Sequence, residues 1–129
     1  MSKISLHILR FGMAITFLWI GILIFRNPEA WIGYIQPWAA NLLLVPPKTA
    51  MFATAVLDIA VGILFLTNYL LWLPAGLASL HLALVLTVSG INAITVRDIG
   101  LLAAAIALFT VYFPLKKVVW LLSIINNKK

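Results

Sequence analysis

Two ionisable side chains could carry chemistry, because each stands alone in a long apolar stretch. Asp58 lies deep in one apolar run and His81 lies in the next. An ionised carboxylate alone in a membrane helix costs about 2.5–3.5 kcal/mol on insertion scales, so Asp58 must face the protein interior, be protonated or have a partner. The sequence therefore makes Asp58 a candidate for a proton or ligand path. An interhelical hydrogen bond that only fixes the packing is the equal alternative.

His81 is the natural partner for Asp58. Asn68 and Tyr69 predict a tight turn, with Asp58 ten residues before it and His81 thirteen residues after. At 1.5 Å per helical residue these positions are about 15 and 20 Å from the turn, so they lie at similar depth on adjacent helices. Such a pair could relay protons or hold a quinone carbonyl. The alternative is a buried histidine whose hydrogen bonds are satisfied without Asp58.

Further polar side chains lead from His81 toward the far end of its helix. Ser89 and Asn92 follow on the same helical face, and Arg97 and Asp98 come soon after. Arg97 and Asp98 could bind an anionic or quinone-like ligand at the mouth of a cleft. The alternative is a helix cap from Asp98 and an interface charge from Arg97. Three aromatic residues at a similar depth could supply apolar walls: Phe17, Trp19 and Trp31.

Arg10 stands near the start of the first apolar run. We expect it to anchor the helix, since its long stem lets the charge reach the headgroups. The alternative is a pair with Asp58 inside the protein. No residue is assigned a catalytic role. The absence of cysteine removes thiolate chemistry, and no acidic or histidine spacing is typical of a metal site. No cofactor motif is evident, and a quinone is the candidate ligand.

The composition shows which elements must hold these residues. The chain has 129 residues, of which 64% are hydrophobic and 9% charged, with a mean hydropathy of +1.14. Soluble domains carry about a quarter charged residues. So few charges cannot cover a water-facing surface, which makes lipid the natural solvent. The net charge is +6, but the basic residues form no stripe along one face, so nucleic acid is not an expected partner.

The predicted fold is an all-α membrane protein, a bundle of four transmembrane helices forming one domain over residues 1–129. Segment 29–48, rich in aromatic residues and prolines, predicts an interfacial first loop with a short helix. The tail, 115–129, predicts a short amphipathic helix at the membrane surface with Lys116, Ser123 and Asn127 on one face. Prolongation of the fourth span is the alternative. The predicted spans are 4–25, 49–67, 70–89 and 99–113.

Counting lysine and arginine predicts the topology. With four spans, six basic residues lie on the side of the two termini and three on the other. We therefore expect both termini in the cytoplasm, in a bacterial or archaeal cytoplasmic membrane. The six are Lys3, Arg10, Lys116, Lys117, Lys128 and Lys129; the three are Arg26, Lys48 and Arg97.

Three stretches resemble the DoxX family. The first span, with Arg10 at its start, Gly21 in its outer half and Arg26 at its close, is similar to the opening of DoxX proteins. The second, Val56-Leu-Asp58-Ile-Ala-Val-Gly62, resembles the family's acidic residue followed by a glycine, although many relatives carry Glu there. The stretch from Val96 to Gly100 looks like the family's basic–acidic start of its last helix.

This resemblance implies a four-helix membrane protein. Some family members are linked to quinone-dependent oxidation of thiosulfate, and others to accessory or redox-stress complexes. Three functions stay open: an accessory or assembly subunit of a membrane complex, a quinone-linked redox subunit, and a small carrier or proton path that uses Asp58 and His81. The first needs Asp58 satisfied in a closed bundle, the second a lipid-accessible cleft, and the third a water-accessible cavity. Expected partners are the bilayer, a membrane or soluble redox protein, and a second copy of the chain.

Overall fold

The computed structural model describes residues 2–126, and every regular element in this part of the chain is an α-helix. Apolar runs of this length form helices in lipid because a helix satisfies its own backbone hydrogen bonds. The helices are α1 (Lys3–Arg26), α2 (Glu29–Ile32), α3 (Pro37–Ala40), α4 (Pro47–Thr67), α5 (Trp72–Ser89), α6 (Val96–Tyr112) and α7 (Leu115–Asn126).

The helices confirm the prediction of an all-α, multi-pass membrane protein. Helices α1, α4 and α5 are each long and apolar enough to cross a bilayer. Helix α6 is shorter, at 17 residues, and passes the same test only together with α7, from which it is bent by 55°. The structure thus has three spanning helices, or four when the bent pair is one span.

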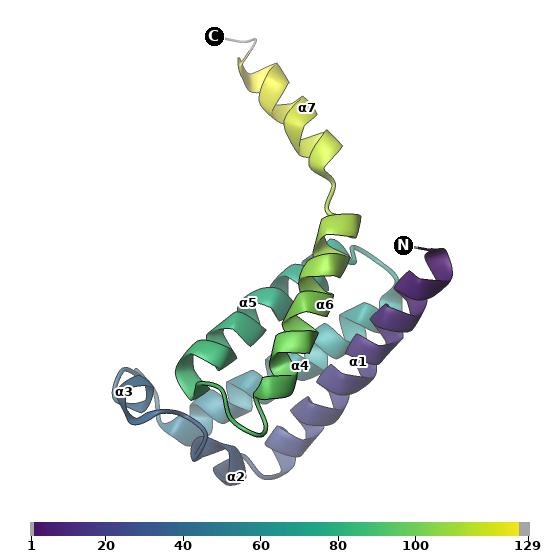
Figure 1. Ribbon diagram of the computed structural model, residues 1–129. Helices are drawn as coiled ribbons and strands as arrows, with labels where there is room; N and C mark the ends of the chain where they lie inside the picture. Colours follow the sequence, from purple (N-terminus) through teal and green to yellow (C-terminus); the bar gives the residue numbers. More distant parts are fainter. Residues whose placement is uncertain (1, 127–129) are drawn as a thin grey trace.

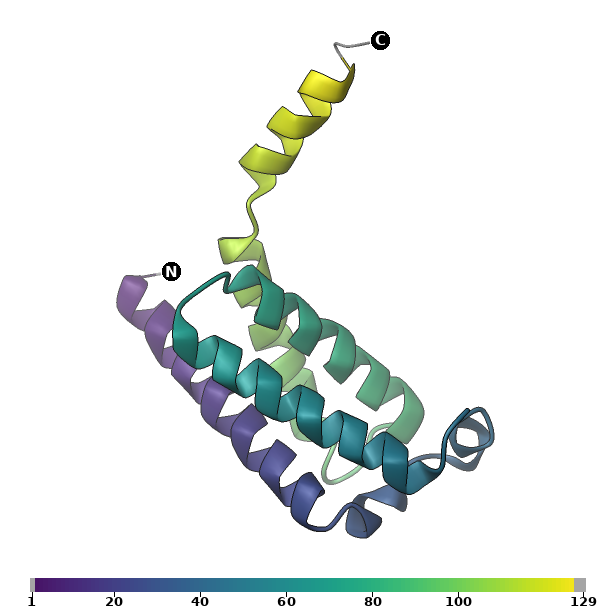
Figure 2. The ribbon, with the colours of Figure 1, turned by 180° about the vertical axis from the view of Figure 1, so that it is seen from behind.

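The four long helices lie side by side in an up-and-down arrangement (Figures 1 and 2). Helix α1 packs mainly on α4, and α5 packs mainly on α6. We call the end that carries the first loop (residues 27–46) and the α5–α6 connection (residues 90–95) the loop end. The opposite end, with the α4–α5 turn (residues 68–71) and the N-terminus, is the turn end.

Two glycines allow α1 and α4 to approach closely. A Cβ atom added to Gly21 would lie 2.8 Å from a side-chain carbon of Ile59 and 3.0 Å from the Cβ of Asp58. A Cβ atom added to Gly62 would lie 2.6 Å from the Cγ of Leu18. Lipid tails are as apolar as leucine, so helices in a bilayer associate largely through such close backbone contacts. These glycines therefore set the position of Asp58 relative to α1.

The ends of α4 and α5 differ slightly from the predicted spans. Helix α4 begins at Pro47, two residues before the predicted start, because proline is well suited to the first helical position. Asn68 then ends α4 in the left-handed conformation, with φ 57°, and Leu70 also has a positive φ, of 45°. A helix cannot begin in that conformation, so α5 starts at Trp72 rather than at residue 70.

Pro114 separates α6 from α7, as the sequence predicts. Phe113 before it has extended backbone, which is the conformation that a following proline favours. Helix α7 has no buried side chain and stands away from the bundle at the turn end (Figures 1 and 2). It therefore does not continue α6 in a straight line. Asn127, Lys128 and Lys129 lie outside the described residues, and a surface position of the tail stays a prediction.

The first loop contains two short helices, α2 and α3, where the sequence predicts one. The Nζ of Lys48 lies 2.8 Å from a carboxylate oxygen of Glu29 and lowers the pKa of Glu29 below its ordinary value through a hydrogen bond and its charge. The backbone N–H of Gln36 donates to the carbonyl of Val88 at 2.9 Å, which fixes the loop to the end of α5. Exposed apolar side chains continue from α3 to α4, as expected at a membrane interface: Trp38, Leu42, Leu44 and Val45.

Candidate functional site

A cavity of about 440 Å³ lies inside the loop end of the bundle. Its walls come from the loop-end halves of α1, α4, α5 and α6, and the first loop covers it. Most of the wall is apolar, with Phe17 from α1 and Leu57 from α4 among its side chains. The polar residues converge from three helices: Asp58 from α4, His81 from α5, and Arg97 and Asp98 from α6. An apolar cavity of this size with a few convergent polar groups is typical of ligand sites.

Asp58 and His81 lie next to each other on the wall of this cavity. The Nε2 of His81 lies 3.1 Å from the Oδ1 of Asp58, and their side chains are only 9% and 5% exposed. The depth count from the turn at Asn68 therefore predicts their contact correctly. The two atoms are close enough for an ion pair, but they are not aligned as a hydrogen bond. Asp58 Oδ1 is buried and has no hydrogen-bond partner among the described residues.

The lack of a hydrogen bond distinguishes Asp58 from a purely structural polar link. A buried acceptor without a hydrogen bond costs about 1–3 kcal/mol, so such groups are rare in native proteins. Here the acceptor belongs to a residue on the wall of a cavity large enough for water or a ligand. Asp58 therefore brings to the cavity wall a carboxylate with one buried oxygen that no described residue satisfies.

Arg97 and Asp98 bring charge to the α6 side of the cavity. The Nε of Arg97 lies 3.9 Å from an oxygen of Asp98, and their side chains are 53% and 14% exposed. Arg97 is thus within reach of the membrane interface, while Asp98 is mostly enclosed. Together with Asp58 and His81, these residues give the cavity lining two carboxylates, one guanidinium and one imidazole.

Asp98 does not cap its helix, which corrects the alternative given for it from the sequence. Helix α6 begins at Val96 with Thr95 at its N-cap, so Asp98 is a residue of the first turn. The side chain of Asn92 fixes the turn before the helix, because its Oδ1 accepts from the backbone N–H groups of Ile94 and Thr95 at 2.8 and 3.0 Å. The hydroxyl of Thr95 accepts in return from the N–H of Asn92 at 2.9 Å.

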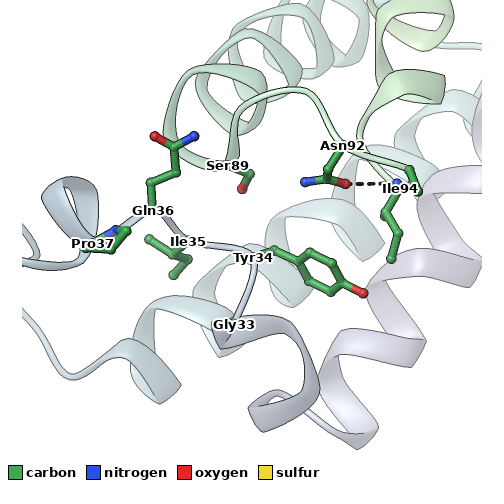
Figure 3. Close-up of a pocket in the computed structure, with 9 residues that line it drawn as sticks. Gly33, Tyr34, Ile35, Gln36, Pro37, Ser89, Asn92 and Ile94 are labelled. Carbon is green, nitrogen blue, oxygen red and sulfur yellow. Dashed lines mark hydrogen bonds between the residues drawn. The ribbon is translucent and has the colours of Figure 1, made fainter.

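Asn92 does not line the cavity. It lies on a separate hollow of about 380 Å³ at the surface of the loop end. Figure 3 shows Ser89 and Asn92 on one side of this hollow, with Tyr34 and Ile35 of the first loop facing them. The polar face expected from His81 through Ser89 to Asn92 thus begins in the cavity and ends at the surface hollow.

The sequence predicts that the charge of Arg10 reaches the headgroups, and this prediction is wrong. Arg10 lies at the turn end and is only 5% exposed. A pair between Arg10 and Asp58 is also wrong, since the Nη1 of Arg10 donates to the Oδ1 of Asn68. Sequence reasoning assigns Asn68 only to the turn. No signal in the sequence pairs Asn68 with Arg10, because the two residues lie fifty-eight positions apart and meet only through helix packing.

Two of the three expected aromatic residues line the cavity. Phe17 is buried in its wall, and Trp31 lies in the part that covers it. Tyr34, which the sequence places only in the interfacial loop, is a further wall residue, with its ring centroid 6.0 Å from that of Trp31. Trp19 is wrong as a wall residue, because it is 66% exposed and does not line the cavity.

No group of three or more histidine, aspartate and glutamate residues placed to hold a metal ion occurs between residues 2 and 126. His81 and Arg97 can donate hydrogen bonds, and Asp58 and Asp98 can accept them.

Comparison with known proteins gives one match. The model of the family described as DoxX matches residues 5–93, which is more than half of the chain. This segment includes Asp58 and His81 and ends before Arg97 and Asp98. The resemblance of the stretch from Val96 to Gly100 therefore lies outside the matched segment. No curated protein and no solved structure matches the chain.

Proposed function

We propose that this chain, which belongs to the DoxX family, is a membrane subunit that binds a quinone-type amphiphile in the loop-end cavity. The observation that supports this proposal is the unsatisfied Oδ1 of Asp58 on the wall of a mainly apolar cavity of about 440 Å³. An accessory subunit that only fixes packing would be expected to satisfy Asp58 within a closed bundle.

The polar groups suit a ring that carries carbonyl or hydroxyl oxygens. His81 Nε2 and the Arg97 guanidinium can donate to a carbonyl oxygen from two different helices. Asp58 Oδ1 can accept from a hydroxyl group, so a quinol would have a partner that a quinone lacks. Phe17, Trp31 and Tyr34 offer aromatic surface to the ring.

The wall between α4 and α5 supports access from lipid. Leu84 on α5 lines the cavity and is also 59% exposed on the outside of the bundle. Ala53 on α4 lines the cavity and is likewise exposed. Because these two residues line the cavity and are also exposed, an amphiphile dissolved in the bilayer has a short route inward between α4 and α5.

The chain's own residues then bind and orient the ligand, and a membrane or soluble redox partner exchanges electrons with it. In this proposal the protein is an accessory subunit with no catalytic residue of its own. It keeps an amphiphilic ring at a fixed depth and orientation for the partner.

Saturable binding of a short-chain quinone analogue to the purified protein in lipid nanodiscs tests the proposal. His81→Gln and Arg97→Gln should each weaken binding about tenfold or more, because a hydrogen bond that involves a charged group contributes about 1.5–3 kcal/mol and each 1.4 kcal/mol is tenfold. The matched controls are His7→Gln and Arg26→Gln, which do not line the cavity.

Two results would count against this function. One is the absence of saturable binding by the natural sequence, which would favour an accessory subunit without a ligand. The other is equal binding by the cavity variants and their controls, which would place the analogue elsewhere on the protein.

A further inference from the structure

The cavity and the surface hollow at the loop end share part of their walls. Tyr34, Ile35, Ser89 and Ile94 line both spaces. The cavity, whose wall includes Asp58 and His81, therefore adjoins the surface hollow along these shared side chains. Figure 3 shows this layer from the side of the hollow, with Ser89 above Ile35 and with Tyr34 beside Ile94. We call these four residues the partition.

We propose that the partition is the gate of a water path along which the Asp58–His81 pair exchanges protons with the solution on the loop side. A proton that leaves the pair passes to water in the cavity, then past Ser89 to water in the hollow. The path deepens the proposed function, since a quinol and a quinone differ in protons as well as electrons. It gives the ligand site a defined side for proton exchange.

The polar groups along this route are spaced for water. Ser89 lies eight residues after His81 on α5, which is about 12 Å along the helix. With waters about 2.8 Å apart, roughly four of them bridge that distance. Buried water needs two to four polar partners, and the cavity offers His81, Asp58 and Asp98 along one side. On the far side of the partition, Asn92 and Gln36 line the hollow.

The partition itself combines one polar and two aliphatic residues with a tyrosine. The Ser89 side chain can pass a hydrogen bond between the two spaces, because a hydroxyl both donates and accepts. Ile35 and Ile94 keep the opening narrow. Ile94 is held in place because its N–H donates to the Asn92 side chain at 2.8 Å. The turn before α6 therefore positions one side of the gate.

The groups that face the pair come from every wall of the cavity. Helix α1 contributes no ionisable side chain to the lining, and the first loop contributes Tyr34. Helix α4 contributes Asp58, α5 contributes His81, and α6 contributes Arg97 and Asp98. No titratable residue of the turn-end halves of these helices lines the cavity. Proton exchange is thereby directed to the loop side.

Single cysteine variants can test the path directly, because the natural sequence has no cysteine. Only a thiolate reacts with a charged methanethiosulfonate reagent, and a thiolate forms only where water reaches it. Val85→Cys probes the cavity between His81 and Ser89. The matched control on the same helix is Leu80→Cys, which is 73% exposed toward lipid. Ile91→Cys, 72% exposed on the loop-end connection, identifies vesicles with the loop end outward.

In such vesicles, Val85→Cys should react at least tenfold faster than Leu80→Cys. Adding Ile94→Trp should slow Val85→Cys about tenfold and leave Ile91→Cys unchanged. Equal reaction of Val85→Cys and Leu80→Cys would overturn the path, as would an unchanged rate with Ile94→Trp. If Val85→Cys does not fold, Val88→Cys in the same cavity replaces it.

A quinone analogue that slows the Val85→Cys reaction supports both proposals. Fast reaction without such protection supports the path and counts against the ligand.

Discussion

Separating Asp58 from His81 gives the sharpest test of how the bundle holds its polar interior. The two side chains approach to 3.1 Å and are almost fully buried, with no aligned hydrogen bond between them. The perturbation is a double-mutant cycle of Asp58→Asn and His81→Gln. Each substitution keeps the approximate size of the side chain and removes one ionisable group.

The distance sets an upper limit on the coupling energy. Two full charges 3.1 Å apart interact by about 5 kcal/mol at an effective dielectric constant of about 20. Removing both groups from water offsets most of this attraction. Polar pairs inside membrane proteins have measured couplings that average about 0.6 kcal/mol, with a maximum near 1.7. We therefore expect each single variant to destabilise the protein and the double variant to lose about 0.6–2 kcal/mol less than the sum.

The free energy of unfolding can be followed by tryptophan fluorescence as a denaturing detergent is titrated into mixed micelles. His7→Gln is the matched control, because His7 is exposed at the turn end of α1. Alone, His7→Gln should change the free energy of unfolding little. Combined with Asp58→Asn, it should add little to the effect of Asp58→Asn. Additivity of Asp58→Asn and His81→Gln within about 0.3 kcal/mol would show that the contact carries no energy.

Three further predictions follow from other parts of the bundle. Gly62→Ala should destabilise the protein by about 1–3 kcal/mol in the same unfolding assay, because the new Cβ would lie 2.6 Å from a side chain of α1; Gly12→Ala, which meets no atom within 4 Å, should not. Asn68→Gly keeps the left-handed turn but removes the acceptor for Arg10. It should therefore lower the free energy of unfolding by about 1.5–3 kcal/mol. A smaller effect than that of Gly12→Ala would contradict the assigned contact. A reporter active only outside the cytoplasm should be active in the first loop and silent after α7, and equal activity at both places would refute the predicted topology.

The family match agrees with what the sequence indicates by itself. The order of apolar runs and breaks predicts an all-α membrane protein, and the helices confirm it. Pro114 ends α6 where the sequence predicts, since the effect of proline on its own and the preceding residue is local. The contact of Asp58 with His81 is also predictable, because a tight turn between two straight helices fixes which residues share a depth.

Other features depend on residues far apart in the chain, and only the tertiary structure decides them. The side chain of Arg10 contacts Asn68 because the N-terminal part of α1 packs beside the α4–α5 turn. The two residues are fifty-eight positions apart in the chain, and no local pattern specifies that approach. Asp98 lines the cavity rather than capping α6, because the helix already begins at Val96 and places Asp98 in its first turn. The cavity and its partition exist because the first loop folds back over four helix ends, and their shape depends on how all of those side chains pack together. The sequence determines that Asp58 and His81 lie within apolar helices, since this follows from local hydrophobicity. The burial of Arg10 and the partners of all these polar residues follow from packing across the whole bundle.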